Sequence, residues 1–235
     1  MGMVAITQGH AGCRYVDHPP HGVFDATLLR IFPSLQDLNF IQIGANDGKR
    51  FDPIHQFVVK YNWRGMLVEP VPVNFRALQA TYAGNCRLIL LPAAVDTVPG
   101  QRVIYHIRED APGNVPEWVW GLASFDRPHL LGTISTMGWT EDVIAAVTVP
   151  VITWSEIWQK LPVGKCDVLV IDTEGHDIRL LRAANLAQHR PKLIQFEHTH
   201  VSEQERMEFY RELIALGYDL ASDRGDTVAW LVSHT

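Results

Sequence analysis

The stretch from Phe40 to Gly48 constrains the fold of this chain more than any other part of the sequence. Apolar residues lead into the small pair Gly44-Ala45, and the turn signal Asn-Asp-Gly follows at residues 46–48. This order predicts a short buried strand that ends in a tight turn. A helical pattern follows, with apolar residues at positions 51, 54, 57, 58 and 61. A strand, a glycine turn and a helix in this order are typical of the place where an open α/β sheet binds a cofactor.

Length and composition predict one soluble α/β domain. The chain has 235 residues, of which 47% are hydrophobic and 20% charged, and no apolar run approaches the ~20 residues of a membrane span. No signal-peptide pattern is found at the start, and the three cysteines lie far apart, so we expect a cytoplasmic protein without a disulfide framework. A net charge of -6 disfavours nucleic acid, which needs a basic face. The expected partner is therefore a small molecule, with no nucleic acid and no membrane, and homo-oligomerisation is left open.

Short apolar strands alternate with amphipathic helices along much of the chain. Strands are expected at residues 38–43, 65–69, 87–95, 167–171 and 192–196, with Pro92 interrupting the third. This rhythm predicts a parallel, right-handed βαβ series. Residues 218–220 and 228–232 are expected to close it as an antiparallel pair. The predicted division is an N-terminal arm and helix at residues 1–37, and the main domain at residues 38–235.

The rhythm breaks between residues 100 and 148. Residues 102–107 are expected to form a strand in a hairpin with the segment that precedes them, and the rest predicts no strong helix or strand. Long irregular insertions are commonly lids or binding loops. The aromatic side chains here could stack on a ligand ring or fill a small core of their own: Trp118, Trp120, Phe125 and Trp139.

The turn at Gly44 does not match a dinucleotide fingerprint. In G-x-G-x-x-G the second glycine lets the backbone approach a pyrophosphate, but here Asn46 stands at that position and Asp47 adds a carboxylate. A carboxylate suits a cofactor with a cationic group, such as S-adenosylmethionine. Glu69 follows at roughly the ~20-residue spacing at which an acid binds a ribose diol. The pattern favours an adenosine cofactor, although Gly44 and Gly48 could merely form a turn, and Glu69 could cap a strand end.

A series of short motifs runs in a fixed order: Ile43–Gly48, Leu67–Pro70, Ala123–Phe125, Ile171–Asp177 and Phe196–Glu197. In this order the chain resembles the FkbM family of S-adenosylmethionine-dependent methyltransferases, from about residue 38 to 232. The resemblance implies a Rossmann-like seven-stranded sheet, mostly parallel with an antiparallel last strand, and helices on both faces. It also implies O-methylation of a small molecule, often a sugar or a natural-product glycoside. Gln42 departs from the pattern, because many methyltransferases of this fold have an acidic residue there, so Asp47 or Asp172 would have to hold the methionine ammonium.

The residues expected at the cofactor share one place, the glycine turn and the ends of neighbouring strands. Ser124 is included because the resemblance places a serine near the cofactor, and Ala94 and Val95 because they would line the adenine slot. The full set is Gly44, Ala45, Asn46, Asp47, Gly48, Glu69, Pro70, Ala94, Val95, Ser124 and Asp172.

An alcohol that accepts a methyl group must lose a proton, so a base is expected beyond the strand ends. His176 is the predicted general base, since an imidazole pKa near ~6.5 suits proton uptake at neutral pH. Glu174 or His198 is expected to orient the base or bind the acceptor, whereas His200 is expected at the surface. His176 could instead only start a helix. The mixture of carboxylates and imidazoles could hold Mg²⁺ or Mn²⁺, but no spacing demands a metal and no metal ligand is predicted.

Two other functions stay open at this point. One is a non-catalytic module that binds the adenosine cofactor without turnover. The other is an NAD-dependent oxidoreductase, against which Asn46 and Asp47 argue.

Overall fold

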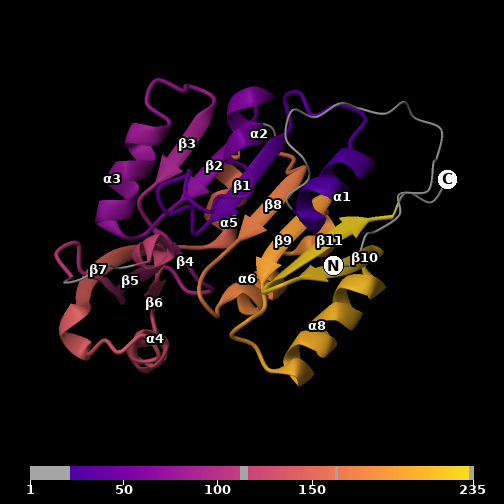
Figure 1. Cartoon of the computed structure of the whole chain (residues 1–235). Coiled ribbons are helices and arrows are strands. Elements are labelled where there is room, and N and C mark those ends of the chain that lie inside the picture. The colour runs from indigo at the N-terminus through magenta and orange to yellow at the C-terminus, as the bar shows by residue number, and fades with distance from the viewer. Residues whose placement is uncertain (1–21, 112–115, 162–163, 233–235) are drawn as a thin grey trace.

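The computed structural model describes residues 22–111, 116–161 and 164–232, so the predicted arm at residues 1–21 lies outside it. A seven-stranded sheet runs through the middle in the order β10-β11-β9-β8-β1-β2-β3 (Figure 1). β11 is antiparallel to both of its neighbours, and every other adjacent pair is parallel. The predicted mostly parallel sheet with an antiparallel last strand is therefore confirmed. Its strands are β1 (Asn39–Ile43), β2 (Arg64–Val68), β3 (Leu88–Leu91), β8 (Val168–Ile171), β9 (Leu193–Glu197), β10 (Tyr218–Asp223) and β11 (Asp226–Leu231).

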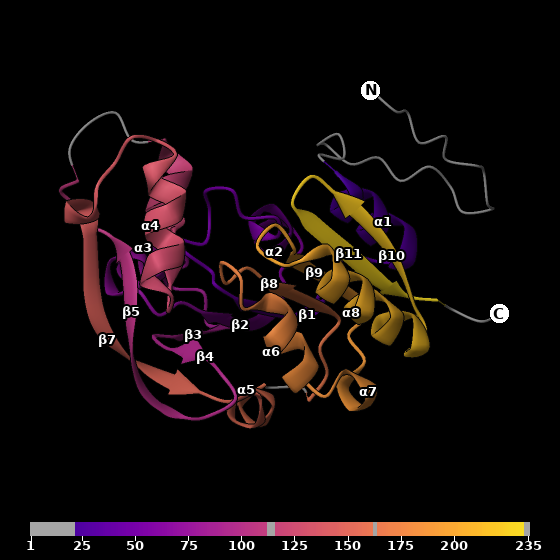
Figure 2. The ribbon, with the colours of Figure 1, turned by 90° about the horizontal axis from the view of Figure 1, so that it is seen from below.

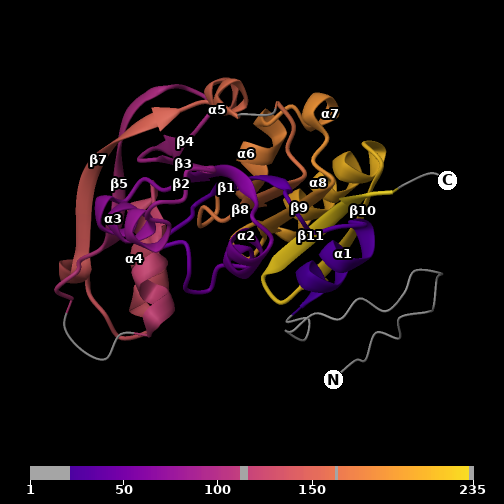
Figure 3. The same ribbon diagram turned by 90° about the horizontal axis from the view of Figure 1, so that it is seen from above.

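Helices cover both faces of this sheet (Figures 2 and 3). Side chains alternate along β1, so Phe40 packs in one core and Ile41 and Ile43 pack in the other. Such two-sided burial explains why the central strands are apolar at nearly every position. Among the described residues, no helix combines the length and the apolar character needed to cross a bilayer. One face carries α1 (Val23–Ile31), α2 (His55–Lys60) and α3 (Pro72–Thr81), and the other carries α5 (Trp154–Lys160), α6 (Asp177–Ala183), α7 (Leu186–His189) and α8 (Glu203–Ala215).

A second sheet lies at the β3 end of the first, far from β10, in all three views (Figures 1 to 3). Its strand order is β4-β7-β5-β6, and we call it the inserted sheet. A small core of its own packs beneath α4, and Trp120 and Trp139 lie against that core. Its elements are β4 (Ala94–Val95), β5 (Gly100–Ile107), η1 (Glu117–Gly121), β6 (Ala123–Ser124), α4 (Arg127–Ser135), η2 (Glu141–Val143) and β7 (Ile144–Ile152).

The inserted sheet corrects two expectations. β5 pairs antiparallel with β7, from Gly100 opposite Val151 to Ile107 opposite Ile144, so its partner follows it in the chain and does not precede it. The region also holds a regular helix that was not expected, and β7 begins at Ile144, five residues before the strand that the sequence predicts at residues 149–152. The sequence obscures both, since Pro150 interrupts the strand pattern of β7 and Gly132 interrupts the apolar pattern of α4. The predicted division into residues 1–37 and 38–235 stays a prediction.

Candidate functional site

A cavity of about 240 Å³ lies at the carboxyl ends of the parallel strands and is lined by both sheets. Open α/β sheets bind ligands at this edge. Most of the residues predicted to contact the cofactor line it, and their roles stay predictions. They are Gly44, Ala45, Asn46, Glu69, Pro70, Ala94, Val95, Ser124 and Asp172.

Gly44 brings the ends of three strands together at the floor of the cavity. Its φ is +80°, and a Cβ atom there would lie only 1.7 Å from the carbonyl oxygen of Asp172. The Gly44 amide donates to the carbonyl of Val68 at the end of β2, at 2.9 Å. Only glycine allows both this backbone conformation and this close approach.

Glu69 is buried, with 4% of its surface exposed, and it fastens the glycine turn to β2. Its carboxylate accepts hydrogen bonds from the amides of Asn46 and Val71, each at 2.8 Å. Burial raises the pKa of Glu69 to about 7, against the effect of these two hydrogen bonds. The side chain thus holds the turn, as the simpler alternative had it, while it also lines the cavity.

Gln42 lies beside a carboxylate that sequence reasoning missed. Its Nε2 donates to Oδ2 of Asp52 at 3.0 Å, and both residues line the cavity. Asp52 also accepts the amides of Ile54 and His55 at the start of α2, and burial raises its pKa. An acidic group therefore lies beside Gln42, the position at which many methyltransferases of this fold were expected to have an acidic residue. The Asp-Pro pair ahead of the helix was the available signal, since Asp is favoured at such a start.

Asp47 and Gly48 are not among the residues that line the cavity. The Asp47 carboxylate accepts the amides of Lys49 and Arg50 and forms an ion pair with the Arg50 side chain. Burial raises the pKa of Asp47, but the Arg50 and Lys49 hydrogen bonds outweigh this effect and hold it below its usual value. Because this carboxylate is engaged within its own turn, we do not assign the methionine ammonium to it.

Carboxylates gather where β8 and β9 end. Asp172 is open to the cavity, yet the surrounding protein raises its pKa well above the usual value. Desolvation is the largest cause, and neighbouring carboxylates add to it, Glu174 first among them. A cation bound here would relieve this repulsion. The other contributors are Asp177, Glu197 and Asp226.

His176 is the N-cap residue of α6, but its side chain makes no capping hydrogen bond. The imidazole lines the cavity and meets the ring of Phe125 edge to face, with 5.7 Å between centroids. Burial lowers the pKa of His176, although the Asp96 carboxylate opposes the shift. The residue thus starts a helix and still presents a neutral ring to the cavity.

Two histidines occupy positions that differ from those expected from the sequence. His198 is buried, bonds through Nδ1 to the hydroxyl of Thr227 at 2.9 Å and does not line the cavity. His200 was expected at the surface, but its side chain is only 20% exposed and lies 3.2 Å from Glu174.

The mouth of the cavity carries exposed aromatic rings. Phe51 is 72% exposed and Trp118 is 45% exposed, and both line the cavity. The helical pattern had placed Phe51 on a buried helix face, but α2 begins only at His55 and Phe51 has a φ of +56°. Exposed aromatic rings beside a cavity suit stacking on a ligand.

Buried polar atoms without a protein partner test whether an adenosine cofactor fits. Among the described residues that line the cavity, Gln42 Oε1, Asn46 Oδ1 and Gln195 Oε1 are such atoms. Buried acceptors are normally hydrogen-bonded, so these favour a ligand rich in N–H and O–H donors. The ammonium and the ribose hydroxyls of S-adenosylmethionine are donors of this kind, and the acidic wall matches its positive charge.

A family model described as Methyltransferase FkbM domain matches residues 42–223. A crystal structure of methyltransferase FkbM from Methylobacillus flagellatus aligns with a TM-score of 0.55 at 14% identity, over 88% of this chain and 46% of that one. The precorrin-6y C5,15-methyltransferase from Geobacter metallireducens aligns with a TM-score of 0.44 at 12% identity, over 88% and 87%. The first likeness shows a shared fold, and the second is too weak to carry an argument. The chain spans about half the length of that FkbM structure. Among curated proteins, none matches the sequence.

Proposed function

The chain belongs to the FkbM family of methyltransferases, and on that premise we propose that it methylates a hydroxyl of a small molecule, such as a sugar or a natural-product glycoside, with S-adenosylmethionine as the donor. The observation that carries this proposal is the cavity at the strand ends. There a buried strand-end acid, an acidic wall and a neutral imidazole line one space: Glu69, Asp172 and His176.

The lining residues divide into those that suit the donor and those that suit the acceptor. Glu69 would accept hydrogen bonds from a ribose diol. Asp52, held by Gln42, and Asp172 supply negative charge for an ammonium or sulfonium. The apolar wall made by Ala94 and Val95 suits an adenine ring.

S-adenosylmethionine supplies an electrophilic methyl group when bound. His176 would accept the acceptor's hydroxyl proton on an imidazole nitrogen as the oxygen attacks. Its lowered pKa keeps the imidazole in the neutral form that can take this proton. Phe125 packs edge to face against the ring and helps to hold its orientation. Phe51 and Trp118 at the mouth would stack on the acceptor.

Donor binding is tested by thermal denaturation with S-adenosylhomocysteine. A ligand of the native state raises the melting temperature, so we expect an upward shift in the wild type and a much smaller one in Glu69→Ala. Glu109→Ala, which removes a carboxylate outside the cavity, is the matched control and should keep the full shift. If the wild type shows no shift at saturating ligand, the proposal is wrong.

Transfer is tested with radiolabelled S-adenosylmethionine against a library of hydroxylated acceptors. For the acceptor found, His176→Ala should lower kcat by about 10²- to 10⁴-fold while the shift with S-adenosylhomocysteine remains. Full turnover in this variant would remove His176 from the mechanism. Donor binding without transfer to any hydroxyl in the library would favour the non-catalytic module.

A further inference from the structure

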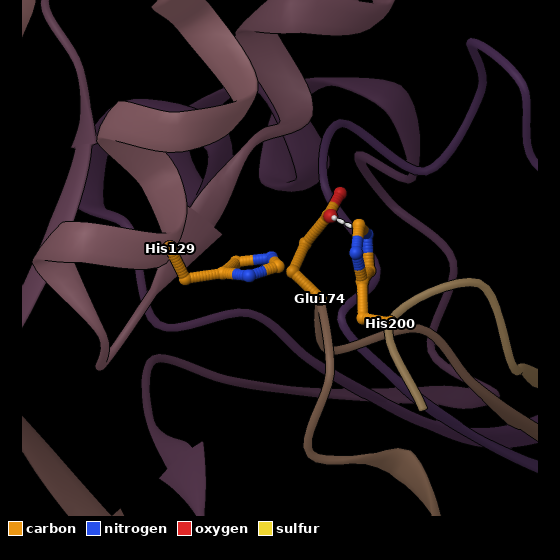
Figure 4. A group of neighbouring side chains, drawn as sticks. All are labelled: His129, Glu174 and His200. Atoms are coloured by element: carbon orange, nitrogen blue, oxygen red, sulfur yellow. Dashed lines mark ion pairs between the residues drawn. The ribbon is translucent and has the colours of Figure 1, made fainter. Parts of the chain in front are cut away.

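Three side chains from distant parts of the chain meet beside the cavity (Figure 4). His129 lies in α4, and Glu174 and His200 lie in the loops after β8 and β9. One ligand atom of each lies within 4.8 Å of the others. The cluster therefore joins the inserted sheet to the main sheet.

The spacing of these atoms suits a shared ion. Nε2 of His200 lies 3.2 Å from Oε2 of Glu174 and 3.5 Å from Oε1 of Glu197. Two ligands bound to one ion at ~2.1 Å lie roughly 3 to 3.5 Å apart. The rings of His129 and His200 are nearly perpendicular, with 4.4 Å between centroids, so they converge without stacking.

Two atoms at this cluster are buried without a hydrogen-bond partner among the described residues. They are Nε2 of His129 and Oε2 of Glu197. Burying such groups unpaired is costly, and most buried polar atoms in proteins have a partner. A cation held by the cluster would give Nε2 of His129 a partner, and its charge would favour the Glu197 carboxylate, which lies 3.5 Å from His200.

We propose that His129, Glu174 and His200 bind a divalent transition-metal ion of the zinc, manganese or iron(II) class. Two imidazoles with a carboxylate select these ions over Mg²⁺ and Ca²⁺, which prefer oxygen ligands throughout. Glu174 also lines the cavity, so the ion lies at its wall. The site does not depend on the proposed methyl donor.

No metal ligand could be predicted here from spacing, because the three side chains are far apart in the chain. Glu174 and His200 end neighbouring strands, but His129 comes from a helix that the sequence did not reveal. Asp126, the N-cap of that helix, accepts the His129 amide at 3.2 Å and so fixes the start of α4. Gly175 lets His200 approach, since a Cβ there would lie 3.3 Å from the Cβ of His200.

The test is a titration of the whole, chelator-treated protein with Co²⁺, followed by its visible absorption and by thermal denaturation with Zn²⁺. We expect one ion per chain and a rise in melting temperature. His129→Ala, His200→Ala and Glu174→Gln should each weaken Co²⁺ binding by at least about 100-fold. His129→Gln and the near-isosteric Glu174→Gln serve where an alanine variant does not fold.

Controls separate this site from other histidines. His106→Ala removes an imidazole outside the cluster and should leave the Co²⁺ spectrum unchanged. So should the joint replacement of His10, His18 and His21, which lie outside the described residues. Persistence of the spectrum in His129→Gln together with Glu174→Gln would overturn the site, as would displacement of Co²⁺ by equimolar Mg²⁺.

The two proposals fail separately. A shift with S-adenosylhomocysteine measured in chelator, without a response to Co²⁺ or Zn²⁺, would overturn the metal site and leave the donor site standing. A response to Co²⁺ or Zn²⁺ without a shift with S-adenosylhomocysteine would overturn the donor site and leave the metal site standing.

Discussion

At the scale of the residue, the burial of Glu69 on folding opposes the ionisation of its carboxyl group, so the stability of the fold depends on pH. Burial raises its pKa to about 7 from the usual 4.5, so between these values the folded protein holds a proton that the unfolded chain has lost. The stability that this proton contributes is complete below about pH 4.5 and is lost as the pH rises through about 7. We therefore expect the free protein to lose stability from pH 5 to 8, and Glu69→Gln to reduce that loss by up to about 3 kcal/mol.

Urea denaturation at several pH values measures this dependence. Asp177 and Glu197 also have pKa values raised to about 7 by burial, so part of the loss persists in Glu69→Gln. Glu109→Gln changes an exposed carboxylate and should reproduce the wild-type profile. A Glu69→Gln profile as steep as the wild-type one would contradict the assignment.

Gly44 offers a second test at this scale. Gly44→Ala would place a methyl group 1.7 Å from the Asp172 carbonyl oxygen, and the two strand ends must separate to admit it. Gly138 has nearly the same φ, +79°, but nothing lies within 4 Å of its Cβ position. Gly138→Ala therefore measures backbone strain alone, at about 1 kcal/mol.

We expect Gly44→Ala to cost at least about 3 kcal/mol, since overpacking adds to the strain. The free energy of unfolding from denaturant titration gives both values. Equal costs in the two variants would mean that the contact between Gly44 and Asp172 is looser than described.

At the scale of the element, α4 depends on its cap. The Asp126 side chain accepts the amide of His129, and loss of an N-cap typically costs about 1 kcal/mol. Asp126→Ala should therefore speed hydrogen exchange over residues 127–135. Thr153→Ala, which removes the capping box of α5, is the matched control and should affect residues 154–160 instead. If hydrogen exchange over α4 is unchanged in Asp126→Ala, the packing of the helix and not its cap accounts for its stability.

Elements whose pattern is local could be predicted from the sequence. The strands of the main sheet follow from apolar runs bounded by turn signals, and Glu69 was placed at the cavity by its spacing from the glycine turn. The pairing of β5 with β7 could not be predicted, because the partner lies beyond a helix and no local pattern specifies it. Asp52 was missed for a related reason, since its contact with Gln42 depends on the path of the chain between β1 and α2.

At the scale of the whole molecule, the cores divide unequally between the two sheets. The main sheet is buried between two large hydrophobic clusters, whereas α4 and the outer ends of β5 and β7 share a small one. Segments with few buried apolar contacts open at lower free energy than the global core. We expect amides of residues 103–107 and 144–147 to exchange faster than those of β1 and β8 in the ligand-free protein.

Native-state hydrogen exchange followed by mass spectrometry measures this difference. Zn²⁺ should slow exchange in α4, because the proposed ion joins it to the loops after β8 and β9. Identical protection across both sheets would show that they unfold as one unit.

The position of β1 between β2 and β8 also determines when the site can form during synthesis. β2 follows β1 directly, but the contact of Asn39 with Asp167 spans 128 residues, and the whole inserted sheet is made in between. Until the ribosome has released β8, the central strand of the growing chain has one free edge. Such an edge pairs readily with other chains, and long-range pairing is slow. We therefore expect the site to form only after β8 has been synthesised, with one edge of β1 open to pairing with other chains until then.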